Sequence, residues 1–156
     1  MSTRTAIGVI GLGAVGTRSL SYLLQEPALQ VSAIWDPATE SRQHDIVGAA
    51  VLGGVRFAAD AAEVIKHSDL VYIATPPKSH RSYAQQVLEA GKLCWCEKPL
   101  SVSEHDALAM MEYARRAKLP TAVNFAYASA WCAQKMQTLV GPGTELGSLR
   151  GISIQL

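Results

Sequence analysis

The sequence predicts an α/β fold, a Rossmann-type doubly wound parallel sheet with helices on both faces. Short apolar runs alternate with amphipathic stretches along its 156 residues, which is the pattern of consecutive βαβ units. The first apolar run ends directly in Gly11-x-Gly13-x-x-Gly16, and a helical pattern follows at once. Polar or unusual residues then fall at the ends of later runs, where a parallel sheet binds its ligands.

The first βαβ unit occupies the start of the chain. Thr5–Ile10 predicts a buried strand, residues 14–25 predict a helix with Pro27 just past its end, and Gln30–Trp35 predicts the second strand. A helix over Ala38–Ala50 is less well supported, because its polar half has few apolar partners.

The middle of the chain continues the alternation. In order, we expect the strand Val55–Ala58, a helix capped by Asp60 and ending at Lys66, the strand Asp69–Ala74, the helix Ser79–Ala90 and the strand Lys92–Cys96. Pro76 and Pro77 form a rigid loop, because two consecutive prolines cannot continue a strand ladder. Gly91 suits the position just past a helix end.

A further helix and strand complete the predicted sheet. Ser101-Val-Ser-Glu104 matches a capping box and predicts a helix to about Lys118. The apolar residues at helical spacing in it are Ala107, Leu108, Met111 and Ala114. Pro120 then precedes a sixth strand, Thr121–Phe125.

The C-terminal stretch has a different pattern. Ala128–Val140 predicts an amphipathic helix, and apolar and polar residues alternate in Leu149–Leu156. This period of two is typical of a strand with one wet face. We therefore expect residues 1–125 to form a dinucleotide-binding domain. Residues 126–156 are expected to hold a linking helix and the first strand of a C-terminal α/β substrate and oligomerisation domain, so that the chain is truncated.

The glycine motif carries the dinucleotide prediction. Gly11 permits a tight turn, Gly13 leaves room for a pyrophosphate, and Gly16 lets the helix pack closely on the strand. The free N–H groups and the positive end of the helix dipole attract the anion. The residues expected to bind the cofactor here are Gly11, Leu12, Gly13, Ala14, Val15 and Gly16.

Asp36 follows Gly16 by 20 residues, which is the spacing expected of the acid that binds the adenosine ribose. A carboxylate there accepts hydrogen bonds from the ribose hydroxyls and repels a 2′-phosphate, so it favours NAD over NADP. A turn aspartate before Pro37 is the alternative. Arg42 keeps NADP possible.

Glu97-Lys98-Pro99 ends the fifth predicted strand and supplies the catalytic candidate. Lys98 on a rigid turn at the sheet edge can donate a hydrogen bond to a substrate oxygen and tune proton transfer. A solvated lysine at a strand end is the alternative. Glu97 either anchors a ribose and fixes the loop or is a surface acid, and Asn124 ends the sixth strand at the same edge.

Ala74 ends the fourth predicted strand, Thr75 and Pro76 follow it, and these residues complete the predicted cofactor edge. Two roles fit His80 at the start of the next helix: it lies near the nicotinamide, or it caps the helix. Cys94 and Cys96 share one strand face without a second close Cys/His pair. Buried core thiols are therefore expected there, with no metal site.

The totals exclude several classes of function. A formal net charge of +1 gives no basic surface for nucleic acid or a membrane, and no apolar run is long enough to span a bilayer. Three cysteines are an odd number, which argues against a disulfide framework and favours the reducing cytoplasm.

The motifs in this order resemble a known family, that of glucose–fructose oxidoreductase, inositol dehydrogenase and rhizopine catabolism proteins. The resemblance rests on Val9-Ile10-Gly11-Leu12-Gly13-x-x-Gly16, Ala74-Thr75-Pro76-Pro77-x-x-His80, Ala90-Gly91-Lys92 and Cys96-Glu97-Lys98-Pro99-Leu100. It covers nearly the whole chain but only the N-terminal half of the family.

The resemblance implies a nicotinamide-dependent oxidoreductase acting on sugars, polyols or related hydroxy compounds. It implies that Lys98 contributes to the active site, that Thr75, Pro76 and His80 line the nicotinamide side, and that Glu97 binds near the cofactor. Family enzymes complete catalysis with an acid–base pair from a C-terminal domain that also mediates oligomers. The chain departs from the family at Tyr127-Ala128-Ser129-Ala130, where an arginine is frequent.

We expect this chain to bind cofactor and to turn over substrate poorly or not at all. A non-catalytic dinucleotide-binding regulatory module is the alternative, because a fold does not guarantee chemistry. A third hypothesis is a homodimer formed through Leu149–Leu156, since an apolar edge strand seeks a partner.

Overall fold

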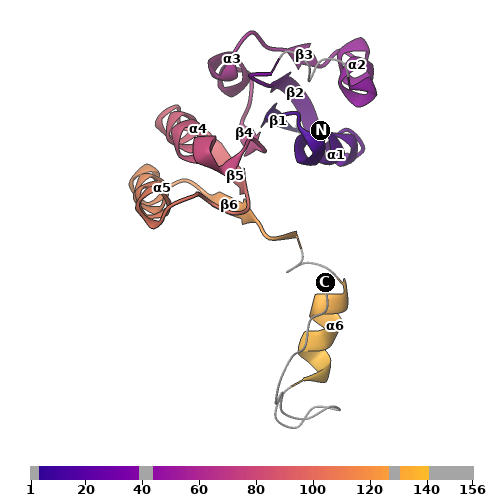
Figure 1. Ribbon diagram of the computed structural model, residues 1–156. Helices are drawn as coiled ribbons and strands as arrows, with labels where there is room; N and C mark the ends of the chain where they lie inside the picture. Colours follow the sequence, from indigo (N-terminus) through magenta and orange to yellow (C-terminus); the bar gives the residue numbers. More distant parts are fainter. Residues whose placement is uncertain (1–3, 39–43, 127–130, 141–156) are drawn as a thin grey trace. The chain divides into compact units, whose positions relative to one another are not determined.

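The structure is a computed structural model that describes residues 4–38, 44–126 and 131–140 (Figure 1). The strands of this part are β1 Thr5–Ile10, β2 Leu29–Trp35, β3 Arg56–Phe57, β4 Leu70–Ile73, β5 Leu93–Glu97 and β6 Thr121–Asn124. The helices are α1 Ala14–Leu23, α2 Asp45–Leu52, α3 Ala61–Lys66, α4 Pro77–Glu89, α5 Glu104–Ala117 and α6 Trp131–Leu139. Strands and helices alternate from β1 to α6, as the sequence predicts.

All strands join one parallel sheet in the order β3-β2-β1-β4-β5-β6. The chain first builds outward from β1 to β3 and then crosses back to β4 on the other side of β1. This arrangement confirms the doubly wound Rossmann-type sheet. It places the reversal of strand order between β1 and β4, which is where such sheets bind dinucleotides.

Helices cover the two faces of the sheet in separate groups. One face carries α1 and α2, and the other carries α3, α4 and α5 (Figure 1). Ile7 and Val9 of β1 pack toward the first group, whereas Ile10 packs toward the second. Side chains of one strand alternate between faces, so the nearly continuous apolar run of β1 serves both cores.

Gly8 lets α3 approach the middle of β1. A Cβ atom at Gly8 would overlap side-chain atoms of Ser68 and Val64. The Ser68 hydroxyl donates to the Val64 carbonyl at 2.7 Å and also contacts Ser32 Oγ at 3.1 Å. The missing side chain therefore sets the close packing between the helix end and the strand.

Two helices begin at different places from those predicted. α2 starts at Asp45 rather than Ala38, with His44 in extended conformation before it, and its apolar residues continue to Leu52. α4 starts at Pro77 rather than Ser79. Proline is favoured at the first helical position, because it needs no partner for an N–H group there.

α5 shows that the predicted capping box is wrong. Ser103 caps this helix, and its side chain accepts a hydrogen bond from the N–H of Asp106 at 3.2 Å. The apolar face is also shifted, because Met110 is buried whereas Leu108 and Met111 are 56% and 62% exposed. The helix packs on the core through Met110, with Tyr113, Ala114 and Ala117 partly buried against it.

The chain divides into two compact units, residues 1–124 and 125–156. The second unit contains α6, which covers most of the helix predicted over Ala128–Val140. The predicted strand Leu149–Leu156 and the departure at Tyr127–Ala130 lie outside the described residues. Among the described helices, none combines the length and apolar character needed to cross a lipid bilayer.

Candidate functional site

The predicted site residues meet along the carboxyl edge of the sheet. The parallel order brings the ends of β2, β1, β4, β5 and β6 to one edge in that sequence. Asp36 follows β2, and Lys98 follows β5, three strand positions away. At a strand spacing of about 4.8 Å this separation is roughly 14 Å, so a ligand that contacts both must be extended across the edge.

The glycine turn packs against the end of β4. Gly11 has a φ of 104°, and a Cβ atom there would lie 2.6 Å from the backbone of Ala74 and Thr75. A Cβ at Gly16 would overlap the carbonyl oxygen of Gly11. Both positions therefore require glycine for the fold itself, because neither a left-handed φ nor these contacts admits a side chain.

Gly13 differs from the other two glycines of the motif. A Cβ atom at Gly13 would meet nothing within 4 Å, and Gly13 is the N-cap of α1. In the described part of the chain, no side chain caps this helix end and its first turn holds no acid. Open space in front of uncapped N–H groups fits a pyrophosphate.

Asp36 is tied to the glycine turn at the end of β2. Its Oδ2 accepts a hydrogen bond from the N–H of Leu12 at 2.5 Å, and its Oδ1 accepts one from Ala38 at 2.7 Å. The carboxylate is half-buried. It therefore performs the Asx-turn role that was the alternative, and the same geometry places a charged acceptor beside the glycine turn.

The loop after β4 is held by buried hydrogen bonds. Thr75 is 6% exposed, and its Oγ1 accepts a hydrogen bond from Ser79 at 2.9 Å. His80 is fully buried, with Nε2 at 2.7 Å from the Thr75 carbonyl oxygen and Nδ1 at 3.2 Å from the Leu100 carbonyl oxygen. The imidazole thus joins the loop after β4 to the loop after β5. Its predicted place on the nicotinamide side stays a prediction.

Glu97 at the end of β5 is the most constrained charge at this edge. Glu97 is 7% exposed. Its Oε1 accepts hydrogen bonds from the Tyr72 hydroxyl at 2.5 Å and from the Asn124 amide. Its Oε2 accepts from the N–H of Lys98 at 3.1 Å. The Lys98 side chain is exposed, and the Lys98–Pro99 peptide is cis.

Hydrogen bonds and burial have opposite effects on the pKa of Glu97. Burial by itself raises the pKa of this carboxyl group, but the hydrogen bonds from Tyr72 and Asn124, followed by the N–H and the charge of Lys98, lower it more. The pKa of Glu97 lies below its ordinary value as a result. A buried carboxylate at neutral pH is therefore a fixed negative charge beside Lys98.

Sequence reasoning missed Tyr72 and Ser19 as members of this edge. Tyr72 lies in the middle of β4 and is fully buried. Its hydroxyl contacts Ser19 Oγ at 3.0 Å as well as Glu97, and its ring packs on Trp95 with centroids 4.6 Å apart. The available signal was a tyrosine inside a buried apolar run, because a buried tyrosine hydroxyl needs a polar partner.

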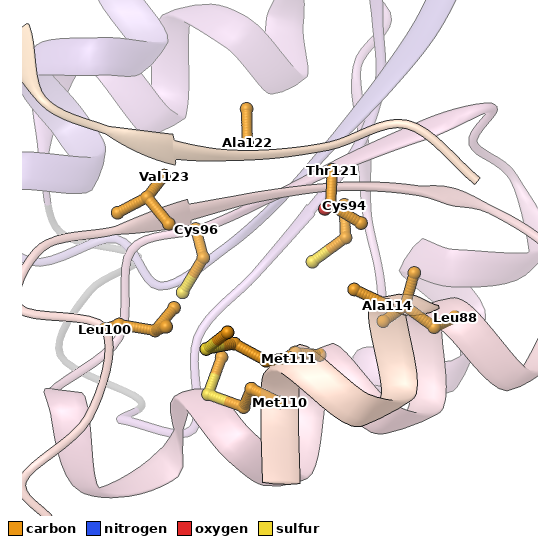
Figure 2. A pocket seen from close by; sticks show the side chains of 11 residues that line it. Leu88, Cys94, Cys96, Leu100, Met110, Met111, Ala114, Thr121, Ala122 and Val123 are labelled. Atoms are coloured by element: carbon orange, nitrogen blue, oxygen red, sulfur yellow. The ribbon is translucent and has the colours of Figure 1, made fainter. Parts of the chain in front are cut away.

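An apolar cavity of about 130 Å³ lies on the other face of the sheet, between β5, β6 and α5 (Figure 2). Figure 2 shows Cys94, Cys96 and Val123 pointing from the strands toward Met110 and Met111. Burial raises the pKa of the Cys94 and Cys96 thiols to about 12. The cavity is a packing gap lined by small and flexible side chains, and the described polar residues of the edge lie elsewhere.

The residues present fit a dinucleotide along the edge. The adenosine ribose would take Asp36, the pyrophosphate would take the uncapped start of α1 beside Gly13, and the far half would reach Thr75, Glu97 and Lys98. Each group would meet the partner it needs, since hydroxyls would meet carboxylates and phosphates would meet N–H groups. These features define a Rossmann domain of the NAD-binding class.

The comparisons with known proteins agree with this class. The chain belongs to the Gfo/Idh/MocA family, described as "Oxidoreductase family, NAD-binding Rossmann fold", which matches residues 5–125. An inositol 2-dehydrogenase of Cereibacter sphaeroides is 33% identical over 109 residues, covering 68% of this chain and 31% of that protein. The family assignment confirms the resemblance, the fold class and NAD as the cofactor.

Two solved structures share the fold. The NAD-binding protein from Listeria innocua has a TM-score of 0.67 and 30% identity, covering 78% of this chain and 35% of that chain. GenD2 from gentamicin A biosynthesis, in complex with NAD, has a TM-score of 0.73 and 25% identity, covering 88% and 40%. The chain thus spans well under half the length of the proteins it matches.

Proposed function

We propose that this chain is the NAD-binding part of an oxidoreductase that moves a hydride between the nicotinamide and a carbinol carbon of a polyol or sugar. The observation that carries the proposal is that groups suited to the two halves of the cofactor lie at different ends of one sheet edge. An acceptor for a ribose, Asp36, lies at the β2 end, and a buried carboxylate next to a lysine, Glu97 and Lys98, lies at the β5 end.

Each group has a defined task in this proposal. Asp36 and the glycine turn bind the adenosine half, and the start of α1 binds the pyrophosphate. The nicotinamide supplies or accepts the hydride. Lys98 donates a hydrogen bond to the reacting oxygen of the substrate and stabilises negative charge there, while Glu97 holds the backbone of the turn from which Lys98 projects.

The substrate class rests on the relatives. The inositol 2-dehydrogenase that matches 68% of this chain acts, by its name, on a polyol hydroxyl. The described edge offers hydrogen-bonding groups and one cation, which suit a neutral hydroxy compound. We propose a second domain beginning at residue 126 that supplies the acid–base pair and the remaining substrate contacts, with a homo-oligomer formed through it.

Cofactor titration tests the proposal most directly. The 156-residue chain is expected to quench or shift NADH fluorescence with a saturable dependence on concentration, and to bind NADPH more weakly. It is expected not to oxidise inositols, because it spans about a third of the matched dehydrogenase. Failure to bind either dinucleotide would overturn the proposal.

Lys98→Ala separates an enzyme from a dinucleotide-binding regulatory module. In a longer form of the protein that carries the substrate-binding part, the change is expected to lower turnover about 10²- to 10⁴-fold and to leave the Kd for NADH unchanged. A regulatory module would keep its output.

The free, buried thiols of Cys94 and Cys96 further support a cytoplasmic location for this function.

A further inference from the structure

A chain of hydrogen bonds beneath the cofactor edge links three strands and one helix. It runs from Ser19 on α1 through the Tyr72 hydroxyl on β4 to Glu97 Oε1 on β5, which also accepts from Asn124 on β6. All these groups lie on the sheet face that carries α1. None of the buried side-chain polar atoms described lacks a hydrogen-bond partner.

The two carboxylate oxygens of Glu97 accept different hydrogen bonds. Oε1 accepts two side-chain hydrogen bonds, from Tyr72 and Asn124, whereas the one hydrogen bond that Oε2 accepts within the described residues comes from the N–H of Lys98 at 3.1 Å. A carboxylate oxygen has room for about two donors. Oε1 is thereby saturated from within the protein, and Oε2 keeps one acceptor position for a donor that arrives at the edge.

We propose that Tyr72 is a positioning residue, which turns the Glu97 carboxylate so that Oε2 is offered to a hydroxyl group of the nicotinamide half of the cofactor. Tyr72 acts through Glu97 and does not touch the cofactor. The inference rests on the proposed function, because it assigns Glu97 to the nicotinamide half of the same site.

The position of Tyr72 makes it suited to this role. It is the largest fully buried side chain described, and its ring is held by Trp95 on the neighbouring strand at a centroid distance of 4.6 Å. A rigid ring presents its hydroxyl at one place only. Phenylalanine would keep the ring packing and would remove the donor, leaving Oε1 with Asn124 alone, so the carboxylate would lose its preferred orientation.

The experiment compares NADH with ADP as ligands of the full chain. ADP contains the adenosine and phosphate groups but no nicotinamide half, so its binding depends on Asp36 and the glycine turn and not on Glu97. For Tyr72→Phe we expect the Kd for NADH to rise about fivefold to tenfold and the Kd for ADP to change less than twofold. Tyr22→Phe, at a tyrosine 68% exposed on α1, is the matched control and should change neither.

A double-mutant cycle shows whether Tyr72 acts through Glu97. Glu97→Gln removes the charge that Tyr72 orients, so Tyr72→Phe should have little further effect on NADH binding in the Glu97→Gln background. Additive effects of the two substitutions would overturn the inference. So would equal losses of NADH and ADP affinity, because these indicate a general defect of the fold.

Two outcomes distinguish this inference from the proposed function. A wild-type chain that binds neither NADH nor ADP refutes the proposed function, whereas normal NADH binding by Tyr72→Phe refutes only the role of Tyr72. If Tyr72→Phe does not fold, carboxyl ¹³C NMR of the wild-type chain replaces it. A Glu97 resonance that titrates at or above the ordinary pKa of a glutamate would then refute the inference, because a carboxylate held by these donors titrates lower.

Discussion

The N–H of Leu12 donates a hydrogen bond of 2.5 Å to the carboxylate of Asp36, and this bond joins the glycine turn to the end of the neighbouring strand. The other oxygen of Asp36 accepts from Ala38 at 2.7 Å. The carboxylate is thus oriented before any ligand arrives. An acceptor fixed in this way loses little conformational freedom on binding a ribose.

Asp36 is expected to set both the affinity for NADH and the discrimination against NADPH. Asp36→Ala should raise the Kd for NADH about 10- to 100-fold, because hydrogen bonds to a charged group are lost. Asp36→Asn keeps an acceptor for Leu12 and removes the charge, so it should lower the preference for NADH over NADPH more than the affinity for NADH. Fluorescence titration with both cofactors measures the ratio, and an unchanged ratio in both variants would contradict this role.

Substitutions of Gly13 and Gly16 are expected to have different effects: Gly13→Ala weakens NADH binding, whereas Gly16→Ala destabilises the fold. Gly13→Ala adds a methyl group to open space, so it should cost less than about 1 kcal/mol of stability while raising the Kd for NADH at least tenfold. Gly16→Ala places a methyl group on the carbonyl oxygen of Gly11 and should cost about 2–4 kcal/mol. Thermal unfolding followed by circular dichroism, with NADH titration of each variant, tests the contrast. Equal losses of stability would refute it.

The sequence predicts the sheet well because the apolar runs and their punctuation are local signals. Thr5–Ile10 is predicted with the bounds that β1 has, and Asp60 caps α3 by accepting from the Glu63 N–H at 2.7 Å, as expected. The N-cap of α5 is harder to predict, because Ser101 and Ser103 are each followed three residues later by an acid. The backbone conformation in the folded chain makes Ser103 the N-cap. The apolar residues of α5 also did not specify the buried face, because Met110 is buried and Met111 is exposed.

The candidate site was predictable at the level of strand ends and not at the level of contacts. The positions of Asp36 and Lys98 at the carboxyl edge of the sheet are predicted by where each apolar run in the sequence ends. The bond from Tyr72 to Glu97 joins residues 25 positions apart on neighbouring strands, and it depends on register. No local pattern specifies register, so the apolar run that contains Tyr72 does not show that its hydroxyl meets Glu97.

His80 is expected to stabilise the fold by joining two loops of the edge. His80→Ala would remove the hydrogen bond that the imidazole donates to one of the carbonyl groups of Thr75 and Leu100, and would open a cavity, at a cost of about 3 kcal/mol. His105→Ala is the control, because the His105 side chain is 82% exposed and should change stability little. Urea unfolding of both variants measures the difference. Similar midpoints for the two would show that the buried imidazole contributes no more than an exposed one.

The thiols of Cys94 and Cys96 are expected to be unreactive in the folded chain and to make its stability fall at high pH. Burial raises the pKa of each thiol to about 12, so both remain protonated at pH 8 and should resist iodoacetamide until urea unfolds the protein.

An unfolded thiol ionises near its ordinary pKa of about 8.5, so the folded chain binds more protons above that pH. The stabilisation is therefore complete below the unfolded pKa and is lost as the pH rises toward 12. Mass spectrometry locates the labelled cysteines, and urea unfolding between pH 7 and pH 10 measures the slope. Because other groups titrate in this range, Cys94→Ala is compared with wild type: a slope no shallower in the variant would contradict the assignment to this thiol.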